Sequence, residues 1–398
     1  MKRRLLHTLL LTFIAAVSSN AQTGLNVSVH CDEPGTLFVK IQEQIEEVGE
    51  LADVTSLTVS GTLNRDDYNV IRNQMTNLAS LDLAGTDNEA MKAMSLSGKK
   101  RLKTIVFSSV ATDIASQALN GCDSLQNFSL PPTVTTIGSN AFQNCKSLTS
   151  ITLPSGMTEI GNSIFADCTN LSQVQLPPAI TTIGSSAFSG TALTAVTIPA
   201  TVTKIENSAY RNCQSLTTVT FLGTGVTLSD NVFRNTGLTS YTLPPGVVIN
   251  GDGTFCDCPN LKSFTFPDGL TDEKMVGTST FWHCYALEQV RLPADLTVIP
   301  NYFFSGTAIT SLDLPAAVTT IRREAYANTK ALREAVLPET LRDIEEYAFW
   351  GSGIEKMVWP RSMTTMKREI FRDCQQLTDV TIPETVDSIA NAPFQNCI

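Results

Sequence analysis

The sequence predicts an α/β repeat solenoid, and two observations support this fold class. A unit of the form L-T-x-V-x-L-P-x-x-V-T-x-I-G-x-x-A-F-x-x-C-x-x recurs from about residue 102 to the end of the 398-residue chain. Successive copies are spaced 22 or 23 residues apart, with a single spacing of 26. A period of this length is typical of solenoids, in which each unit buries its apolar side against the neighbouring units.

The first part of each unit predicts a short β-strand. In the copy at residues 148–154, Ile151 and Leu153 alternate with polar residues, which is the period of a strand with one inward face. The proline that follows ends the strand, because it has no N–H group to donate to a neighbour. Strands from successive units should therefore stack as a parallel sheet, with about 4.8 Å between neighbours.

The second part of the unit predicts a return segment and a helical turn. Residues 134–138 should lead the chain back, and residues 139–142 are expected to form a helical turn that is capped by Ser139 or Asn140. An aromatic residue recurs near the end of this turn and predicts a stacked spine of rings in the interior. Its members are Phe142, Phe165, Phe188, Tyr210, Phe233, Phe255, Phe304, Tyr326, Phe349, Phe371 and Phe394.

The region before the regular repeats predicts an N-terminal helical cap over residues 22–95. It holds two apolar stripes at helical spacing, namely Leu37, Ile41, Ile45 and Val48, and Val70, Ile71, Met75 and Leu78. Val59 and Leu83 mark two divergent strands. Such a segment would cover the open end of the stack, and the repeat array would then occupy residues 96–398.

The two ends of the chain carry further expectations. Residues 1–21 are typical of a secretory signal peptide, with Lys2, Arg3 and Arg4 before an apolar stretch at residues 9–17. No cysteine follows the predicted cleavage site, so a lipid anchor is not indicated, and no later stretch approaches the roughly 18 apolar residues of a transmembrane helix. The last unit stops before its next strand, so the array is expected to be cut mid-repeat.

Most of the cysteines occupy a single position of the unit, three residues after the aromatic. Parallel, in-register side chains do not converge as a disulfide requires, so inward-facing thiols are favoured over disulfides between units. Where the cysteine is missing, the unit usually shrinks by one residue, as at Thr191 and Thr307, and Thr329 replaces it once. One possible ligand per unit is not the spacing of a tetrahedral metal site, so no metal is predicted. The cysteines of this ladder are Cys122, Cys145, Cys168, Cys213, Cys258, Cys284, Cys374 and Cys397.

The composition favours binding over catalysis. A formal net charge of −10 without a basic stripe disfavours nucleic acid as a partner. Beyond the predicted leader the only histidines are His30 and His283, and no nucleophile, phosphate-loop or metalloprotease motif occurs. A polysaccharide-cleaving enzyme would need paired carboxylates on a sheet face, whereas outward carboxylates occur singly, as Asp313 does. The sequence therefore predicts a protein that is not an enzyme and needs no cofactor.

The repeated unit closely resembles the BspA-like leucine-rich repeat, over about residues 102–398. That family occurs in bacterial secreted and cell-surface proteins. The resemblance implies a leucine-rich repeat fold and a location outside the cell. It also implies an adhesin-like role, in which one face of the solenoid recognises an extracellular protein or glycoprotein, for example of the host matrix. A carbohydrate-binding surface component, with a glycan as its partner, is the alternative.

The outward strand positions change character along the array. Early units carry Ser, Thr or Gln there, whereas later units carry Arg291, Asp313, Val336 and Val358. Exposed valines beside charged residues are unusual, and they predict a contact patch in the C-terminal half.

Two tryptophans follow aromatics of the spine on another side of the solenoid. Trp282 and Trp350 occupy a position that is otherwise held mainly by Gln, Ser, Ala or Arg. Exposed tryptophans are typical interface anchors or sugar-stacking platforms. Local packing against adjacent turns is an equally weighted alternative for each. Trp359, which replaces a core leucine, is expected to be structural.

Overall fold

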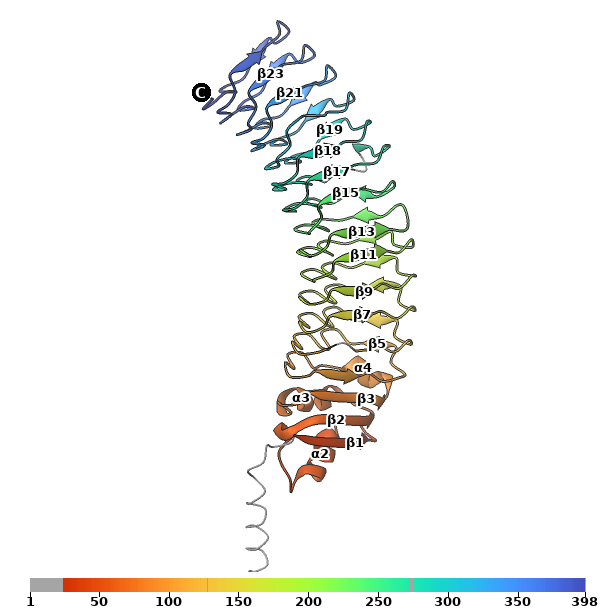
Figure 1. The fold of residues 1–398 in the computed structure, drawn as a ribbon. Coiled ribbons are helices and arrows are strands. Elements are labelled where there is room, and N and C mark those ends of the chain that lie inside the picture. Colours follow the sequence, from red (N-terminus) through yellow and green to blue (C-terminus); the bar gives the residue numbers. More distant parts are fainter. Residues whose placement is uncertain (1–23, 127, 273–274, 276, 398) are drawn as a thin grey trace, which may run out of the picture.

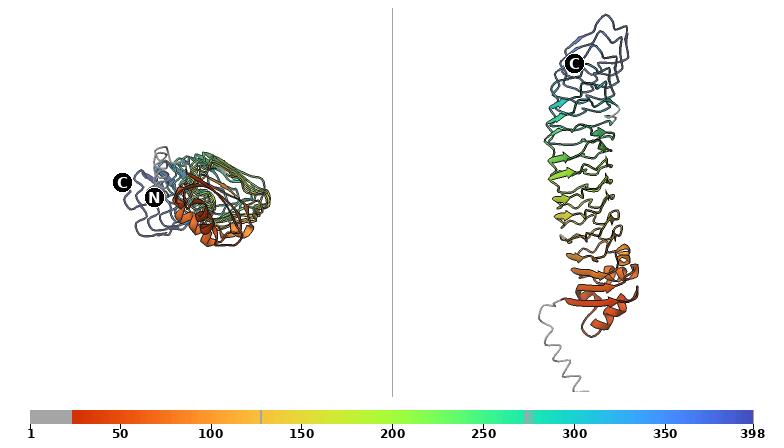
Figure 2. Two further views of the ribbon diagram at one scale, coloured as in Figure 1. Left: turned by 90° about the horizontal axis from the view of Figure 1, so that it is seen from below. Right: turned by 90° about the vertical axis from the view of Figure 1, so that its right-hand side faces the viewer.

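A computed structural model describes residues 24–126, 128–272, 275 and 277–397 of the chain. These residues form one elongated, curved rod with the helical region at one end (Figure 1). Seen from one end, the coils in the middle of the rod superpose, and the C-terminal coils are displaced to one side (Figure 2). The predicted signal peptide, residues 1–21, lies outside the described residues.

The N-terminal region combines four parallel strands with helices. β1 (Leu25–Cys31), β2 (Val54–Gly61), β3 (Ser80–Thr86) and β4 (Thr104–Val106) form one sheet in that order. The connecting segments contain α2 (Leu37–Ile45), a 3-10 helix at Leu51–Asp53, α3 (Arg65–Gln74) and α4 (Asn88–Ala93). The two helices and two strands expected here are confirmed, and β1 and α4 add to them.

The buried stripe of α2 is shorter than the sequence indicates. Leu37, Ile41 and Ile45 are buried as predicted. Val48 is 66% exposed, because α2 ends at Ile45 and the chain turns away before Val48 can join the buried stripe. The prediction for Val48 is therefore wrong.

Lys99 closes the C-terminal end of α3. The residue is only 4% exposed. Its Nζ donates hydrogen bonds to the carbonyl oxygens of Ile71 at 2.6 Å and Arg72 at 3.3 Å, and also to that of Met75. The last carbonyl groups of a helix lack partners within it, and a positive charge is favourable at this end. Lys99 thus ties α3 to the start of the array.

Most coils of the array contribute one short strand to the first side of the rod. Successive strands are parallel and in register, as in the pairing of Ile151 with Val174 and of Val196 with Val219. The parallel stacking is confirmed, and so are the predicted strands except those before Leu130 and Leu314, where residues 128–130 and 310–314 form no strand. The strands are β7 (Ser150–Thr152), β9 (Gln173–Gln175), β11 (Ala195–Ile198), β13 (Thr218–Phe221), β15 (Ser240–Thr242), β17 (Ser263–Thr265), β18 (Gln289–Arg291), β21 (Glu334–Val336), β23 (Lys356–Val358) and β25 (Asp379–Thr381).

The return segment of most coils adds a two-residue strand on a second side. Its inward residue is an Ile, Leu or Met in every case, and all these residues are buried except Ile389. The second side therefore consists of short parallel strands and not of irregular connections alone. These strands are β5 (Asp113–Ile114), β6 (Thr136–Ile137), β8 (Glu159–Ile160), β10 (Thr182–Ile183), β12 (Lys204–Ile205), β14 (Thr227–Leu228), β16 (Val248–Ile249), β19 (Val298–Ile299), β20 (Thr320–Ile321), β22 (Asp343–Ile344), β24 (Thr365–Met366) and β26 (Ser388–Ile389).

The third side of each coil is a run of turns, so the predicted helical turn is wrong. In residues 138–145, Ala141 and Gln143 donate their N–H groups to carbonyls three residues earlier, whereas Asn140 and Asn144 donate theirs to the next coil. Asn140 and Asn144 have φ angles of 62° and 60°, in the left-handed region that Asn tolerates better than most residues. In the stack, alternate N–H groups bond to carbonyl oxygens of the neighbouring coil. In a helix these N–H groups would bond within the coil, and the neighbouring carbonyl oxygens would lose their partners.

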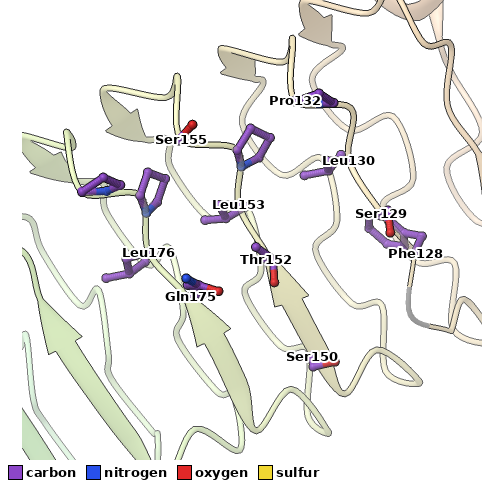
Figure 3. Close-up of a pocket in the computed structure, with 13 residues that line it drawn as sticks. Phe128, Ser129, Leu130, Pro132, Ser150, Thr152, Leu153, Ser155, Gln175 and Leu176 are labelled. Atoms are coloured by element: carbon purple, nitrogen blue, oxygen red, sulfur yellow. The ribbon is translucent and has the colours of Figure 1, made fainter.

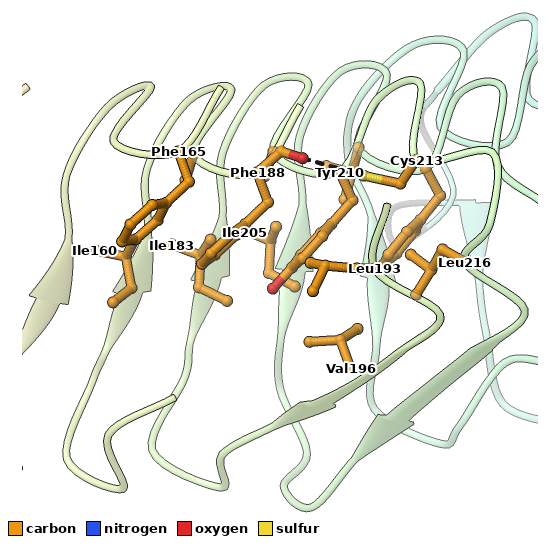
Figure 4. Packing of buried hydrophobic residues seen from close by; sticks show 14 of the residues in the cluster. Ile160, Phe165, Ile183, Phe188, Leu193, Val196, Ile205, Tyr210, Cys213 and Leu216 are labelled. Atoms are coloured by element: carbon orange, nitrogen blue, oxygen red, sulfur yellow. Dashed lines mark hydrogen bonds between the residues drawn. The ribbon is translucent and has the colours of Figure 1, made fainter. Parts of the chain in front are cut away.

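A continuous spine of aromatic rings runs along the interior. From Phe142 to Phe394, successive ring centroids lie 5.2–6.2 Å apart and all pairs are stacked. Figure 4 shows Phe165, Phe188 and Tyr210 in this stack. The predicted spine is confirmed. Phe281 also belongs to the spine. It is not at the usual position of the repeated unit, because its unit is 26 residues long.

The cysteine ladder is a row of thiols that links neighbouring coils. Each ladder Sγ donates to a backbone carbonyl of the preceding coil, as Cys168 does to Phe142 at 3.0 Å and Cys213 to Phe188 at 3.1 Å. All ten cysteines lie within the described residues and all are free thiols. Burial raises the pKa of the Cys168 thiol to about 12, so it remains protonated at neutral pH.

Threonine continues the ladder where cysteine is missing. Thr191, Thr307 and Thr329 stand at the same position, and each hydroxyl donates to the carbonyl three residues earlier in its own coil, at 2.7–2.8 Å. The residue missing from the short units therefore lies after this position. The sequence interpretation of Thr191 and Thr307 as marking gaps in the ladder is corrected accordingly.

The first sheet is interrupted at three of the short units. β9 and β11 are not hydrogen-bonded neighbours, nor are β13 and β15, and residues 310–314 form no strand between β18 and β21. In these places the spacing between units is 22 residues. β21 and β23 remain paired across an equally short unit, so the shortening alone does not break the sheet.

Candidate functional site

Two adjacent valines dominate the outer surface of the first sheet in the C-terminal half. Val336 in β21 and Val358 in β23 are register partners, and they are 78% and 63% exposed. The next partner in the row is Thr381 of β25. Two large aliphatic side chains in register on a solvated sheet form a small apolar ridge, and the exposure predicted for them is confirmed.

A row of alternating charges runs beside this ridge. Glu334, Lys356 and Asp379 are register partners across β21, β23 and β25 and lie two residues before the valine row. All three are exposed. The surface therefore offers apolar contact area next to both signs of charge, a combination suited to an interface with an apolar centre and a polar rim.

Arg291 and Asp313 line a hollow at the interruption of the sheet. The hollow has a volume of about 730 Å³ and lies between β18 and residues 310–315. The guanidinium of Arg291 donates to both carboxylate oxygens of Asp268, at 2.8 and 3.1 Å, and to the carbonyl of Phe266 at 3.2 Å. Asp313 accepts a hydrogen bond from the hydroxyl of Ser311. The missing strand thus leaves a recess with oriented charges on the same side of the rod as Val336 and Val358.

The two tryptophans lie on the side formed by the turns and not on the strand surface. Trp282 stacks on His283 with 4.1 Å between ring centroids, and His283 stacks on Tyr285 at 5.3 Å. Tyr285 is 65% exposed, whereas Trp282 is half-buried. The structure therefore separates Trp282 from the valine ridge and places it in a short stack of three rings.

Trp350 is held by its own neighbours. Its Nε1 donates a hydrogen bond to the carboxylate of Asp373 at 2.8 Å. Its ring packs edge-on against the ring of Tyr347, with 6.5 Å between the ring centroids. Hydrogen bonds from Asn396 and Trp350 hold the pKa of Asp373 below its ordinary value. These contacts within adjacent coils support the local-packing alternative for Trp350. Trp359 is 1% exposed and belongs to the core, as predicted.

A groove on the outer side of the first sheet was not predicted from the sequence. It has a volume of about 480 Å³ and crosses three coils at residues 128–132, 150–155 and 175–178. Figure 3 shows Ser129, Thr152 and Gln175, each followed by a leucine of its own coil, with prolines of the lining beside them. Each of these residues is an ordinary repeat position, so only the stacking of coils reveals the groove.

Two kinds of feature are absent from the part of the chain that the structure describes. No cluster of three or more His, Cys, Asp or Glu side chains there could hold a metal ion. None of its helices has the length and apolar character needed to cross a membrane.

The repeats decide the family. The model of the BspA type leucine rich repeat region, which spans six copies, matches residues 90–217, 181–307 and 297–398. The chain belongs to this family. Its members share the repeated unit described above, so the expected leucine-rich repeat fold is confirmed. No curated protein matches the chain.

Solved structures of bacterial leucine-rich repeat proteins are similar to this BspA-type array. One from Bacteroides ovatus has a TM-score of 0.60 at 21% identity, and the match covers 87% of this chain and 77% of that one. A leucine rich cell surface protein from Faecalibacterium prausnitzii has a TM-score of 0.46 at 23% identity, with 82% and 79% covered. At these identities the first likeness shows the fold alone, and the second is too distant to add to it.

Proposed function

We propose that this BspA-type array is a secreted or cell-surface protein that binds an extracellular protein or glycoprotein and is not an enzyme. The binding surface is the first sheet from β18 to β25, with Val336 and Val358 at its centre and Arg291 and Asp313 at its edge. The observation that carries the proposal is the exposed, in-register valine pair next to a charged hollow.

The geometry favours a protein partner over a small molecule at this surface. The valine ridge protrudes from a sheet, so a ligand could not enclose it without a broad complementary face. Fully burying a valine side chain stabilises a complex by about 1.5–3 kcal/mol, and the neighbouring charges would orient the partner. The hollow beside Arg291 is of a size to receive one or two side chains of that partner.

Export is proposed from the leader sequence. Residues 1–21 have the basic start, apolar stretch and small residues of a signal peptide, with cleavage expected before Gln22. Mass spectrometry of the mature protein from its native host should give an N-terminus at Gln22. An intact Met1 on the native protein would contradict export by this route.

The binding test compares equivalent pairs of residues in two parts of the sheet. The double variant Val336→Thr and Val358→Thr should weaken binding to its partner in a panel of immobilised extracellular-matrix proteins at least about tenfold, because it removes apolar contact area but keeps residues that favour strands. The control is Thr197→Ser with Thr220→Ser, a register pair at the same unit position. Adding Arg291→Gln to the valine variant should abolish binding. Equal binding by the valine variant and the control would reject this surface.

Carbohydrate binding is the second candidate, and two observations favour it. The groove in Figure 3 is lined by hydroxyl, amide and apolar groups without a charge, and Tyr285 offers an exposed ring at the end of a stack. Aromatic rings and neutral hydrogen-bonding groups are the usual partners of uncharged sugars. A glycan array is the discriminating measurement. Retention of neutral glycans without any matrix protein would favour this second function.

A further inference from the structure

We propose that a polar pocket between the cap and the array binds an acidic oligosaccharide, whose carboxylate or sulfate groups contact Arg65, Arg72 and Lys92. This site lies apart from the strand surface discussed above and does not rest on the function proposed for it. Helices α3 and α4 and the first coils of the array meet at this point of the rod (Figure 1).

The pocket is assembled from three separate segments. Arg65, Asn69 and Arg72 lie at helical spacing on one face of α3, Lys92 lies on α4, and residues 94–97 and 115–117 complete the lining. Its volume is about 670 Å³, within the range of about 300–1,000 Å³ that small-molecule sites occupy.

The positive charge of the pocket is only partly compensated. Arg72 donates to Asn69 Oδ1 at 2.8 Å and to Ser95 Oγ at 3.0 Å, and neither acceptor carries a charge. The guanidinium group of Arg65 has no hydrogen-bond or ion-pair partner among the residues that the structure describes. Lys92 pairs with Glu89 at 2.9 Å on the exposed rim. Asp113 also lies close enough to act on the charge of Lys92, so the three cations of the pocket are opposed by Glu89 and Asp113, in a chain whose net charge is −10.

The remaining lining suits hydroxyl groups and not an apolar ligand. Asn69, Ser95, Ser97, Ser116 and Gln117 supply neutral donors and acceptors, and the apolar contribution is limited to two alanines and one methionine. Guanidinium groups recognise carboxylate and sulfate oxygens with two parallel hydrogen bonds. A ligand that matches both features carries anionic groups on a hydroxyl-rich frame, as an acidic oligosaccharide does.

The hydrogen bond from Arg72 to Ser95 Oγ holds the guanidinium group in place in the pocket. The guanidinium bridges α3 to residue 95 through Ser95 Oγ, so its position is fixed before a ligand arrives. An oriented cation loses less conformational entropy on binding than a mobile one. Arg72 is consequently part of the architecture, and Arg65 and Lys92 are the better positions for a test.

The experiment is isothermal titration of the whole chain with trigalacturonic acid, a sulfated chondroitin oligosaccharide and the neutral maltotriose. At least one acidic ligand should bind about tenfold or more tightly than maltotriose, with an affinity that falls as salt is added. Arg65→Gln and Lys92→Gln should each weaken that binding about five- to tenfold. Comparing the two acidic ligands shows whether carboxylate or sulfate is preferred.

Arg361→Gln is the matched control, because Arg361 is an exposed basic residue near the other end of the array. It should leave the affinity unchanged, and circular dichroism should show that all three variants are folded. Equal affinity for maltotriose, absence of binding by both acidic ligands, or unchanged binding by Arg65→Gln and Lys92→Gln would overturn the proposal. None of these results bears on the valine surface, whose variants are tested with other ligands.

Discussion

The two halves of the array share one interior and differ on the outside. Residues 102–271 contain 15 charged residues, whereas the shorter stretch 272–398 contains 29. In the first half the outward strand positions hold Ser, Thr or Gln, as in the pairing of Thr197 with Thr220. In the second half the equivalent positions hold Arg291, Val336 and Val358, yet the aromatic spine passes through both halves without a break.

Stacking constrains the inward residues far more than the outward ones. A ring of the spine contacts the rings of both neighbouring coils, so its size and position are fixed by them. An outward side chain meets water, and exchanging one polar residue for another there changes stability little. The second half can therefore carry charges and exposed valines without disturbing the stacked interior.

The coils around residue 310 are coupled differently from the coils on either side of them. Cys284 and Cys374 each donate a hydrogen bond to the preceding coil, whereas Thr307 and Thr329, which lie between them, bond within their own coils. Residues 310–314 additionally lack strand pairing on both sides. The coils around residue 310 should therefore be coupled mainly by the spine, the second sheet and the turns.

The largest expected effect tests the shared interior. Phe188→Ala and Phe349→Ala remove fully buried rings from the first and second halves. Each should lower the free energy of unfolding by about 3–5 kcal/mol, measured by urea denaturation, because a large cavity opens between two stacked neighbours. Phe188→Leu is the control and should cost less, since it retains most of the apolar volume. A loss below about 1 kcal/mol in only one half would show that the spine is not equally important in both.

The next largest loss of stability is expected from substitutions in the cysteine ladder. Cys168→Ala should cost about 1–2 kcal/mol, because it removes a buried thiol and its hydrogen bond to the preceding coil. Thr329→Ala loses a bond within its own coil, so it should cost about 1 kcal/mol and leave neighbouring coils coupled. Hydrogen exchange distinguishes the two, because Cys168→Ala should also speed exchange in the coil before it. Protection lost equally in both variants would contradict this difference.

Acid should loosen the second half through Glu369 and Asp373. A hydrogen bond from Arg372 holds the pKa of Glu369 below its ordinary value of 4.5, and hydrogen bonds from Asn396 and Trp350 hold that of Asp373 below 3.8. Groups whose pKa is lowered by folding stabilise the fold above their ordinary pKa and lose this effect as the pH falls through the folded value. In the unaltered chain, protection of the amides of residues 369–373 against exchange should increase as the pH is raised from about 3. In the variant Glu369→Gln this increase should be smaller, because the variant lacks one of the two carboxylates.

The control for the acid experiment is the coil around Phe188, because residues 171–193 contain no charged side chain. After correction for the intrinsic pH dependence of exchange, its protection should change less between acid and neutral pH. Equal changes in the two coils would remove the role assigned to Glu369 and Asp373.

The smallest expected effect on stability comes from replacing an outward valine of the second half with threonine, which is common at this position in the first half. Val358→Thr should change the free energy of unfolding by no more than about 0.5 kcal/mol, because the side chain is 63% exposed and Thr also favours strands. The same substitution should nevertheless weaken partner binding in the panel described above. A loss of several kcal/mol would mean that Val358 is structural and not a contact residue.

Local periodicity made most of the fold predictable. Ile151 and Leu153 indicate an inward strand face, and Phe142 and Phe165 indicate the spine, because the same contacts recur in every coil. The conformation of the turns escaped prediction, since Asn140 and Asn144 suit a helix cap as well as a left-handed turn until the hydrogen bonds to the next coil are known. Phe281 escaped because an insertion shifted its position in the sequence.

By itself, the sequence determined the family, the stacked interior and the residues that face outward, because these depend on patterns repeated within a single unit. Only the tertiary structure decided which outward residues meet. It separated Trp282 from Val336, oriented Arg291 against Asp268, and gathered Arg65, Arg72 and Lys92 into one pocket. Such groupings depend on the spacing and rotation between coils and on the way the cap joins them, which no single unit encodes.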